Sequence, residues 1–384
     1  MTKTPHAIRL VFIADGTSVH TKYWSTEFMQ RGYDVHIISF TPEPVEGVKV
    51  HQLKYFGKIA YPLRIWSVRR AVRKIRPDVL HAHYISNYGV YAALSGFNPI
   101  VMSAWGDDID TGPERSRIVK FFVKFALKRA EVVHTGDELG KRRLIELGCD
   151  KRKILVQNWG IDTDLFSPTA RSQALRKRLG IEDSYSVLCA RYWSPEYHVD
   201  VFLRAVPLVL GKMPNVKFIL LGGGILEKNL KELANNLGID RNVLFLGKVG
   251  RDEMPAYLAS VDVYVDTITD FVTNASGDGP PRRGGGGIGQ TTGQAMSCGT
   301  PQILSDQLNA RMGDWFRGIM YRQSDYRDLA QKIIDLLPDE KLRKKIGEES
   351  RKVVLQSWNL EKTLKMWDSI YNELSGLSAS ERGS

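Results

Sequence analysis

Residues 79–106 read VLHAHYISNYGVYAALSGFNPIVMSAWG, and the fold prediction rests on the pattern in this stretch. Two short apolar runs, Val79–His83 and Ile100–Ser103, flank a segment over Tyr88–Ser95 that we predict to be helical. Short apolar runs separated by a helix are typical of parallel strands joined by a right-handed crossover. The stretch therefore predicts a strand–helix–strand unit of a parallel sheet.

The same alternation extends along most of the chain and restarts once. Strands are predicted upstream at Ile8–Ala14 and Val35–Ser39, and downstream at Glu131–His134. A second series begins at Tyr185–Cys189 and ends at Gln302–Ser305. A chain of 384 residues is too long for one ordinary core and suits two. We predict an α/β protein with two Rossmann-like domains that face each other across a cleft.

The predicted domain boundaries follow from the point at which the alternation of strands and helices begins again. We predict a first domain over residues 1–166, a second over 167–360, and a C-terminal helix and tail over 361–384 that cross back to the first domain. Phe166-Ser167-Pro168 is the predicted linker. Open α/β sheets bind ligands at the carboxyl ends of their strands, so we expect the site in the cleft.

Composition and charge narrow the function classes. Hydrophobic residues make up 43% of the chain and charged residues 25%, which excludes an intrinsically disordered protein. The first apolar run is short and contains Arg9, which indicates a buried strand and not a signal peptide, so we expect a cytoplasmic protein. The three distant cysteines, Cys149, Cys189 and Cys298, argue against a disulfide framework or a zinc site. A net charge of +11 favours anionic partners, and without a recognised binding module nucleic acid is not expected among them.

Several segments, in this order along the chain, resemble the retaining glycosyltransferases of family 4, also called glycosyltransferase group 1. They are Asp15–Trp24, Pro77–Tyr84, Ser103–Asp108, Asn158–Asp162 and Gln294–Pro301, the last with an Ala-Met-x-Cys-Gly-x-Pro core. The resemblance implies the two-domain GT-B fold. It further implies a nucleotide-diphosphate sugar bound mainly by the second domain, a hydroxyl acceptor bound mainly by the first, and neither a cofactor nor a metal. A lipid or lipid-linked glycan would fit as the acceptor.

The resemblance also implies roles for individual residues of the second domain. Arg191 stands where the family has an arginine that neutralises the donor diphosphate, which gains negative charge in the transition state; the alternative is a surface ion pair. A lysine that usually follows is replaced by Tyr197, which can donate a hydrogen bond but carries no charge. Gly222, Gly223 and Gly224 end a strand, where backbone N–H groups can approach a phosphate; the alternative is a plain tight turn.

One departure from the family concerns its two acidic residues, which are separated by seven positions and contact the donor. The aligned positions here are Gly286 and Gln294, of which only Gln294 can bind a diol through its side-chain amide. We predict that Arg282 and Arg283 supply the charge lost at Tyr197; the alternative is a solvated loop with incidental arginines. The predicted donor-binding residues are Asp15, Gly16, Tyr197, Gly222, Gly223, Gly224, Gly247, Lys248, Val249, Arg282, Arg283, Gly286, Gly287, Ile288, Gly289, Gln290, Thr291, Thr292 and Gln294.

In the first domain, His83 follows a strand and is expected to face the cleft, with His81 on the opposite face of the strand as a packing residue. Asp107 and Asp108 follow the next strand and could bind acceptor hydroxyls; the alternative is a helix cap or turn pair. Trp105 could stack on a sugar or belong to the core. The predicted catalytic residues are His83, Asp107, Asp108 and Arg191, and the predicted acceptor-binding residues are His20 and Trp105.

Two basic stretches, Tyr61–Arg76 and Arg115–Arg129, have the pattern of amphipathic helices with cationic faces. Such helices can lie on an anionic membrane surface, which would place the protein on the cytoplasmic face of a membrane. The alternative is that Phe121, Phe122 and Phe125 face the core. Three functions remain open: a retaining glycosyltransferase, a non-catalytic homologue that binds sugars or partner proteins, and a nucleotide-sugar epimerase.

Overall fold

The computed structural model describes residues 7–54, 61–268, 271–272, 282–283, 289–306 and 316–381. The chain divides into two compact units, residues 1–157 with 364–384, and residues 158–363. The predicted linker lies inside the second unit, where Phe166 is buried and its carbonyl oxygen accepts a hydrogen bond from Ser297 Oγ at 2.6 Å. The C-terminal segment belongs to the first unit from Leu364 onward, close to the predicted crossing.

The first unit is built on a seven-stranded parallel sheet in the order β3-β2-β1-β4-β5-β6-β7. Its strands are β1 (Arg9–Ile13), β2 (Asp34–Ser39), β3 (Lys49–Gln52), β4 (Val79–His83), β5 (Ile100–Ser103), β6 (Val132–Thr135) and β7 (Ile154–Val156). Its helices are α1 (Val19–Gln30), α2 (Tyr61–Ile75), α3 (Val90–Leu94), α4 (Asp107–Asp110), α5 (Gly112–Arg115), α6 (Arg117–Arg129), α7 (Glu138–Glu146) and α16 (Leu360–Glu381). A π-helical turn, Ile85–Gly89, precedes α3.

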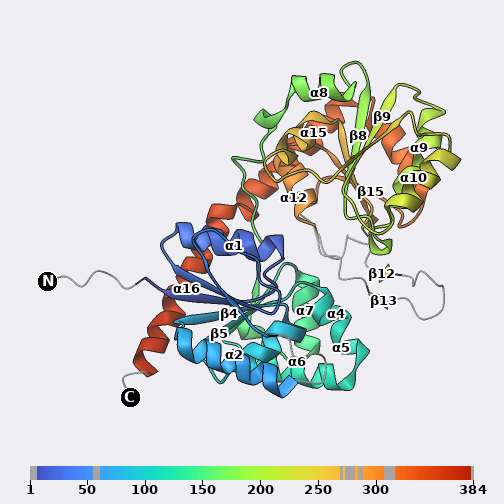
Figure 1. The fold of residues 1–384 in the computed structure, drawn as a ribbon. Coiled ribbons are helices and arrows are strands. Elements are labelled where there is room, and N and C mark those ends of the chain that lie inside the picture. Colours follow the sequence, from blue (N-terminus) through green and yellow to red (C-terminus); the bar gives the residue numbers. More distant parts are fainter. Residues whose placement is uncertain are drawn as a thin grey trace. The chain divides into compact units, whose positions relative to one another are not determined.

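The five strands between the edge strands β3 and β7 are buried on both faces, as expected of a parallel sheet covered by its crossover helices. Leu80 and Ala82 of β4 belong to an apolar cluster with side chains of α2, α3 and α6. On the other face, Phe12 contacts Phe28 of α1, and His81 contacts Tyr371 of α16. Figure 1 shows the same layers, with α1 and α16 on one side of the sheet and α2 and α6 on the other.

The predicted orientation of His81 is wrong. His81 and His83 lie on the same face of β4, with ring centroids 4.8 Å apart. Successive side chains of a strand alternate between faces, so residues two apart share one. Both imidazoles therefore belong to the layer between the sheet and the helices α1 and α16.

The second unit contains a six-stranded parallel sheet in the order β10-β9-β8-β11-β14-β15. Its strands are β8 (Tyr185–Ala190), β9 (Val216–Leu221), β10 (Val243–Gly247), β11 (Val263–Asp266), β14 (Gln302–Ser305) and β15 (Ile319–Tyr321). The helices are α8 (Gln173–Leu179), α9 (Val199–Leu210), α10 (Glu227–Asn236), α11 (Met254–Ser260), α12 (Gln290–Ser297), α14 (Tyr326–Leu336) and α15 (Glu340–Ser357), and β12 (Phe271–Val272) pairs with β13 (Arg282–Arg283). In Figure 1, α9 and α10 lie on one side of the sheet and α12 and α15 on the other. Two Rossmann-like parallel sheets confirm the predicted fold class.

Candidate functional site

A pocket of about 290 Å³ lies at the carboxyl ends of β8, β9 and β10, and we call it the second-unit pocket. Arg191 follows β8, Gly222 follows β9, Lys248 follows β10, and Thr291 lies in the first turn of α12. Ligands of open parallel sheets bind at this edge. The lining residues are Ala190, Arg191, Tyr192, Tyr197, Leu221, Gly222, Gly223, Lys248, Val249, Met254 and Thr291.

Position 222, where the ends of β8 and β9 meet, requires a glycine. Its φ is +140°, and a Cβ at this position would lie 1.9 Å from the carbonyl oxygen of Arg191. Gly224 has a different neighbour, because a Cβ there would lie 2.4 Å from the carbonyl oxygen of Trp193, and Gly224 does not line the pocket. Of the three glycines, Gly222 and Gly223 therefore present their backbone to the pocket, whereas tight packing explains Gly224.

Arg191 is held by a carboxylate that the sequence analysis missed. Its Nε donates to Asp266 Oδ1 at 2.7 Å, and its Nη2 donates to Asp266 Oδ2. Asp266 is fully buried, and the side chain of Arg191 is only 7% exposed. Arg191 is therefore part of a buried ion pair, and not of the surface pair considered as the alternative. The signal for Asp266 was a carboxylate that ends an otherwise apolar strand.

Lys248 provides the second cation of the pocket. Its side chain is exposed and lies against Gly223, and its Nζ lies 5.8 Å from the ring centroid of Tyr192. Within the described residues, Lys248 forms no ion pair. Because Asp266 compensates the charge of Arg191, Lys248 gives the described pocket its net positive charge. Tyr197, at the position of the family's lysine, places its ring 5.8 Å from the Arg191 guanidinium carbon.

The remaining predicted donor residues are placed only in part. Gly247 ends β10, Gly289 directly precedes α12, and Gln290 is the first residue of α12. Thr292 is buried beside Asp266, and Gln294 is half-buried on the same helix. Arg282 and Arg283 form β13, but their side chains lie outside the description, as do Gly286, Gly287 and Ile288 altogether.

Three predicted residues of the first unit come together at the carboxyl end of β4, where His83 is the last residue of the strand. The Trp105 ring centroid lies 4.8 Å from that of His20 and 5.5 Å from that of His83. Burial, together with the nearby His134 and His20, lowers the pKa of His83 to about 3, so its imidazole is neutral near pH 7. His83 is only 4% exposed, beneath Phe12 and Trp105.

The two neighbouring aspartates are engaged within the fold. Asp108 is fully buried and accepts hydrogen bonds from the backbone N–H of Ile85 at 2.6 Å and of Trp105 at 2.9 Å. Burial raises its pKa to about 7. Asp107 accepts a hydrogen bond from the hydroxyl of Tyr84 at 2.7 Å. These contacts favour the turn-stabilising alternative, most strongly for Asp108, since both of its carboxylate oxygens accept hydrogen bonds from the backbone.

Asp15 and Gly16 form the loop after β1. Asp15 Oδ1 accepts hydrogen bonds from the hydroxyls of Thr17 at 2.8 Å and Thr41 at 2.6 Å. The backbone N–H of Gly16 donates to Ser39 Oγ at 2.9 Å, and a Cβ on Gly16 would lie 2.7 Å from the carbonyl oxygen of Thr41. The loop is thus fastened to the end of β2.

Among the described residues, no three His, Cys, Asp or Glu side chains are grouped so that they could hold a metal ion. No helix in the described part of the chain is long and apolar enough to span a membrane.

Comparison with known proteins covers both units. A family model described as glycosyl transferase 4-like matches residues 9–136, and the model of the glycosyl transferases group 1 matches residues 171–353. The chain is 27% identical over 206 residues to a GDP-mannose-dependent alpha-(1-6)-phosphatidylinositol monomannoside mannosyltransferase of Mycolicibacterium smegmatis. That match covers 52% of this chain and 51% of the relative, so it spans about half of the relative's length.

Two further similarities extend over most of the chain. The chain is 23% identical over 373 residues to N-acetyl-alpha-D-glucosaminyl L-malate synthase of Bacillus anthracis, with 91% of each chain covered. Its fold is similar to the crystal structure of Anabaena HepE in complex with UDP and glucose, with a TM-score of 0.74 and 19% identity, over 94% of this chain and all of HepE.

Proposed function

Because the chain belongs to the group 1 glycosyltransferases, which have the GT-B fold, we propose that it transfers a sugar from a nucleotide-diphosphate sugar to a hydroxyl acceptor with retention of configuration. The observation that carries the proposal is the second-unit pocket, where Arg191, Lys248 and the backbone of Gly222 and Gly223 converge. The two cations and the backbone N–H of Gly223 suit a diphosphate, because such groups recognise phosphate oxygens, whereas the N–H of Gly222 already donates to the carbonyl oxygen of Gly247 at 2.8 Å.

The proposed chemistry uses the same groups. As the bond to the sugar breaks, negative charge develops on the departing nucleotide diphosphate, and fixed donors and cations stabilise that charge. In a front-face reaction the acceptor attacks from the side of the leaving group, and the departing phosphate takes the acceptor proton. Such a reaction needs neither a protein base nor a bound metal, and the two carboxylates missing at Gly286 and Gln294 do not preclude it.

The names of the relatives suggest which substrates to test. One relative is described as GDP-mannose-dependent with a phosphatidylinositol monomannoside acceptor, and HepE was crystallised with UDP and glucose. We propose a UDP- or GDP-linked sugar as the donor, and a hydroxyl of a lipid or lipid-linked glycan as the acceptor. Because Gly286 and Gln294 replace the two acidic residues, we expect a donor preference different from that of the relatives.

A thermal-shift screen of nucleotide sugars tests the donor. A ligand that binds the native state raises its melting temperature, by an amount that grows with its concentration above Kd. We expect a UDP- or GDP-sugar to raise the melting temperature and to be hydrolysed slowly, with release of the nucleoside diphosphate. Binding without release would favour the non-catalytic homologue, and interconversion of epimeric sugars would favour the epimerase. No shift with any nucleotide sugar would contradict the proposal.

The loop arginines require a test of their own, since their side chains lie outside the described residues. If Arg282 and Arg283 contribute phosphate-binding charge, the double change Arg282→Ala/Arg283→Ala lowers donor turnover. Unchanged kinetics would leave the incidental arginines of a solvated loop as the explanation.

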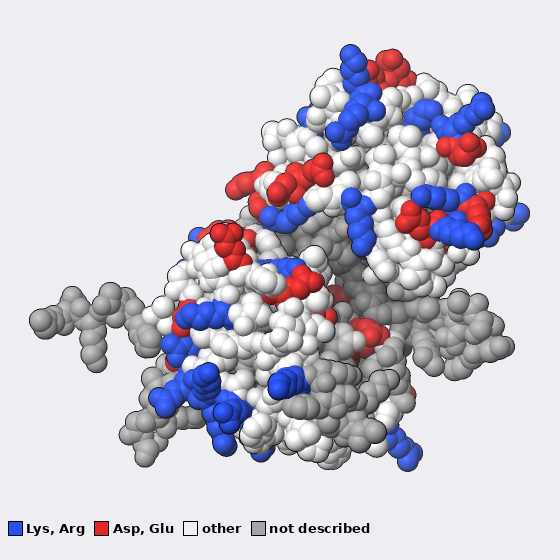
Figure 2. All heavy atoms as spheres, in the orientation of Figure 1, with Lys and Arg blue, Asp and Glu red and all other residues white. Residues whose placement is uncertain are grey.

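We also propose that the first unit binds an anionic membrane surface through α2 and α6. Neither helix contains an acidic residue. Trp66 on α2 is 59% exposed, and Phe121 on α6 is 66% exposed, whereas Phe122 and Phe125 pack against the core. Exposed basic residues lie beside these aromatic side chains. Figure 2 shows basic side chains along the lower part of the first unit, where Figure 1 places α2. The exposed basic residues are Arg69, Arg70, Arg73 and Lys74 on α2 and Arg117, Lys124 and Lys128 on α6. Exposed aromatic residues beside cations are typical of helices that lie on anionic lipid.

Cosedimentation with vesicles tests this surface. We expect the protein to bind phosphatidylglycerol vesicles more strongly than phosphatidylcholine vesicles, and to be released by salt. The double change Trp66→Ser/Phe121→Ser should weaken binding about tenfold or more, since each side chain would bury apolar area in the lipid. Leu355→Ser, which alters an exposed apolar residue of the second unit, is the control. Equal binding by the two variants would remove α2 and α6 from the membrane contact.

A further inference from the structure

We propose that Asp266 is a positioning residue of the second-unit pocket. By holding Arg191, it determines which nitrogen of the guanidinium group faces the diphosphate. The inference rests on the proposed function. Asp266 does not line the pocket itself and is fully buried at the end of β11, directly behind Arg191. Asp266 therefore makes no direct contact with a ligand in this pocket, and can act on it only through its charge or through the residues that it holds in place.

Residues from three different parts of the second unit donate hydrogen bonds to the carboxylate of Asp266. Besides Nε and Nη2 of Arg191, it accepts a hydrogen bond from Thr292 Oγ1 at 2.5 Å and one from the backbone N–H of Ile268 at 3.0 Å. Thr292 lies on α12, whose first turn forms part of the pocket wall. Asp266 thus ties the end of β8, the end of β11 and the start of α12 to one another.

The hydrogen bonds of Arg191 engage two of its three guanidinium nitrogens and leave the third for a ligand. Asp266 occupies the edge made by Nε and Nη2, and Nη2 also donates to Thr292 Oγ1 at 3.3 Å. Nη1 has no hydrogen-bond partner within the described residues. A planar guanidinium that is held along one edge presents the donors of its remaining nitrogen in a fixed direction, which suits recognition of phosphate.

Gly289 restricts the guanidinium from a second side. A Cβ on Gly289 would lie 2.1 Å from Nη1 and 2.7 Å from Nη2 of Arg191. No residue other than glycine fits at this position without displacing the guanidinium. The carboxylate of Asp266 and the bare backbone of Gly289 therefore determine together where Arg191 points.

A role in positioning and a simple effect of charge predict opposite results. Asp266 is a negative group behind an anion-binding pocket, so by Coulomb's law alone its removal should strengthen the binding of a diphosphate. If Asp266 positions Arg191, its removal should weaken that binding. Asp266→Asn keeps the volume, but an amide can accept from only one of the two guanidinium nitrogens.

The experiment measures the affinity of a nucleoside diphosphate and of its monophosphate by calorimetry on the full chain. UDP, GDP and ADP are the probes, and the tightest of them is compared with its monophosphate in each variant. The dissociation constant of the monophosphate divided by that of the diphosphate isolates the contribution of the second phosphate. We expect Asp266→Asn to reduce this ratio about tenfold, because a charge-assisted contact is weakened. Gly289→Ala should reduce it in the same direction while Asp266 and its charge remain.

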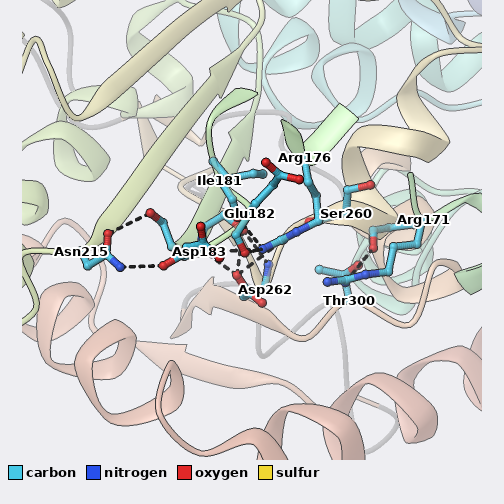
Figure 3. A network of polar contacts seen from close by, with 12 residues as sticks. Arg171, Arg176, Ile181, Glu182, Asp183, Asn215, Ser260, Asp262 and Thr300 are labelled. Carbon is cyan, nitrogen blue, oxygen red and sulfur yellow. Dashed lines mark hydrogen bonds and ion pairs between the residues drawn. The ribbon is translucent and has the colours of Figure 1, made fainter. Parts of the chain in front are cut away.

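Asp262→Asn is the matched control for loss of a carboxylate from the same strand. Asp262 directly precedes β11, at the opposite end from Asp266, and accepts hydrogen bonds from the backbone N–H and the hydroxyl of Ser186, both at 2.8 Å. Figure 3 shows Asp262 beside the buried guanidinium of Arg176, which donates to the carbonyl oxygen of Ser260 at 2.6 Å. Asp262→Asn should lower stability but leave the monophosphate-to-diphosphate ratio of dissociation constants unchanged.

The outcomes separate the two claims. If no nucleoside diphosphate binds the unaltered protein, the proposed function fails and the inference fails with it. If a diphosphate binds normally and its ratio is unchanged or increased in Asp266→Asn, the inference alone is overturned. An equal fall in the ratio for Asp262→Asn would also overturn it, because the effect would then reflect general loosening of the second unit.

Discussion

At the scale of single residues, Arg191 and Lys248 line the same pocket but are held in different ways. Removing Arg191 would leave the carboxylate of Asp266 buried without its cation, and breaking a buried ion pair in this way costs about 3–5 kcal/mol. Lys248 is exposed and forms no ion pair within the described residues. Changes at the two positions should therefore separate the contribution of a cation to binding from its contribution to folding.

The first prediction concerns Lys248→Gln. We expect this change to weaken binding of a nucleoside diphosphate about tenfold, because a charged hydrogen bond or close cation contributes about 1.5–3 kcal/mol. The free energy of unfolding should change by no more than about 0.5 kcal/mol, as for other surface substitutions. Arg191→Gln, the comparison variant, should lose both binding and stability. Calorimetry and urea unfolding provide the two measurements, and full diphosphate affinity in Lys248→Gln would place the phosphates elsewhere.

The residue scale is also where sequence reasoning was weakest. The position of Arg191 after a strand was predictable, because parallel strands present their carboxyl ends at one edge of the sheet. Its partner Asp266 was not recognised, because it is distant in sequence and only the order of the strands makes β8 and β11 neighbours. The position of Asp108 was predictable from the sequence, but its role was not. An aspartate after a strand fits both a ligand contact and a turn, and only its burial and its two backbone partners distinguish them.

At the scale of elements, a chain of hydrogen bonds crosses three adjacent strands of the first unit. His134 Nε2 donates to the carbonyl oxygen of Gln157 at 2.7 Å, so its Nδ1 must accept from Ser103 Oγ, 3.1 Å away. The hydroxyl oxygen of Ser103 then accepts from His81 Nε2 at 2.8 Å, and His81 Nδ1 accepts from the hydroxyl of Tyr371 at 2.6 Å. Every donor in this chain has one acceptor, and the direction of each bond follows from the first.

The second prediction tests that chain at its end on α16. Tyr371→Phe leaves the buried Nδ1 of His81 without a donor, and an unsatisfied buried acceptor costs about 1–3 kcal/mol. Tyr33→Phe is the control, because the Tyr33 hydroxyl donates to Asp368 at 3.0 Å in a half-buried position and its loss should cost less. Urea unfolding compares the two. A larger loss for Tyr33→Phe would mean that water replaces the Tyr371 hydroxyl without cost.

The elements themselves were predicted unevenly, for physical reasons. Val79–His83 and Ile100–Ser103 coincide with β4 and β5, because strands buried on both faces are continuously apolar. The edge strand β15 was missed, since it is short and two of its three residues are only half-buried. Helix α7 was missed as well, although Asp137 marks its start by accepting a hydrogen bond from the backbone N–H of Gly140 at 2.7 Å. That capping signal could have been used.

At the scale of the whole molecule, α16 begins in the second unit and supplies core residues to the first. Trp367 and Tyr371 are buried against the aromatic face of the first sheet, where Tyr371 contacts Phe28 and Trp367 contacts His134. The first unit is therefore assembled from two segments far apart in the chain, and it cannot complete its core until the second unit and α16 are present.

The third prediction follows from this arrangement. A chain truncated after Thr363 loses the two aromatic side chains, each of which contributes about 3–5 kcal/mol when buried. We expect its first unit to be degraded by a protease under conditions in which the second unit persists. A chain truncated after Gly376 retains both side chains and serves as the control. Equal resistance of the two truncated chains would show that α16 is dispensable for folding of the first unit.

The last prediction concerns the stability of the molecule in acid. Burial lowers the pKa of His134 to about 4 and of His83 to about 3, and it lowers the pKa of His81 well below 6.5. Between about pH 6.5 and pH 4 the unfolded chain binds protons that the folded chain does not, so these three groups stabilise the fold above pH 6.5 and less as the pH falls. Each contributes a slope of up to about 1.4 kcal/mol per pH unit in that window. Asp108 opposes them, because its raised pKa of about 7 makes the folded chain bind a proton that the unfolded chain has lost.

The pKa values of His20, His36 and His51 are lowered as well, so six histidines of the first unit act against one carboxyl. Unfolding of the first unit therefore takes up protons, and its stability should fall steadily from pH 6.5 to pH 4. Urea unfolding across this range measures the slope, and hydrogen exchange of the β4–β6 segments assigns the transition to the first unit. His134→Gln should flatten the slope by about one proton even if it lowers stability at every pH, because the amide does not titrate. A slope in the variant as steep as in the unaltered protein would mean that His134 is already protonated in the fold, which its acceptance of a hydrogen bond from Ser103 does not allow.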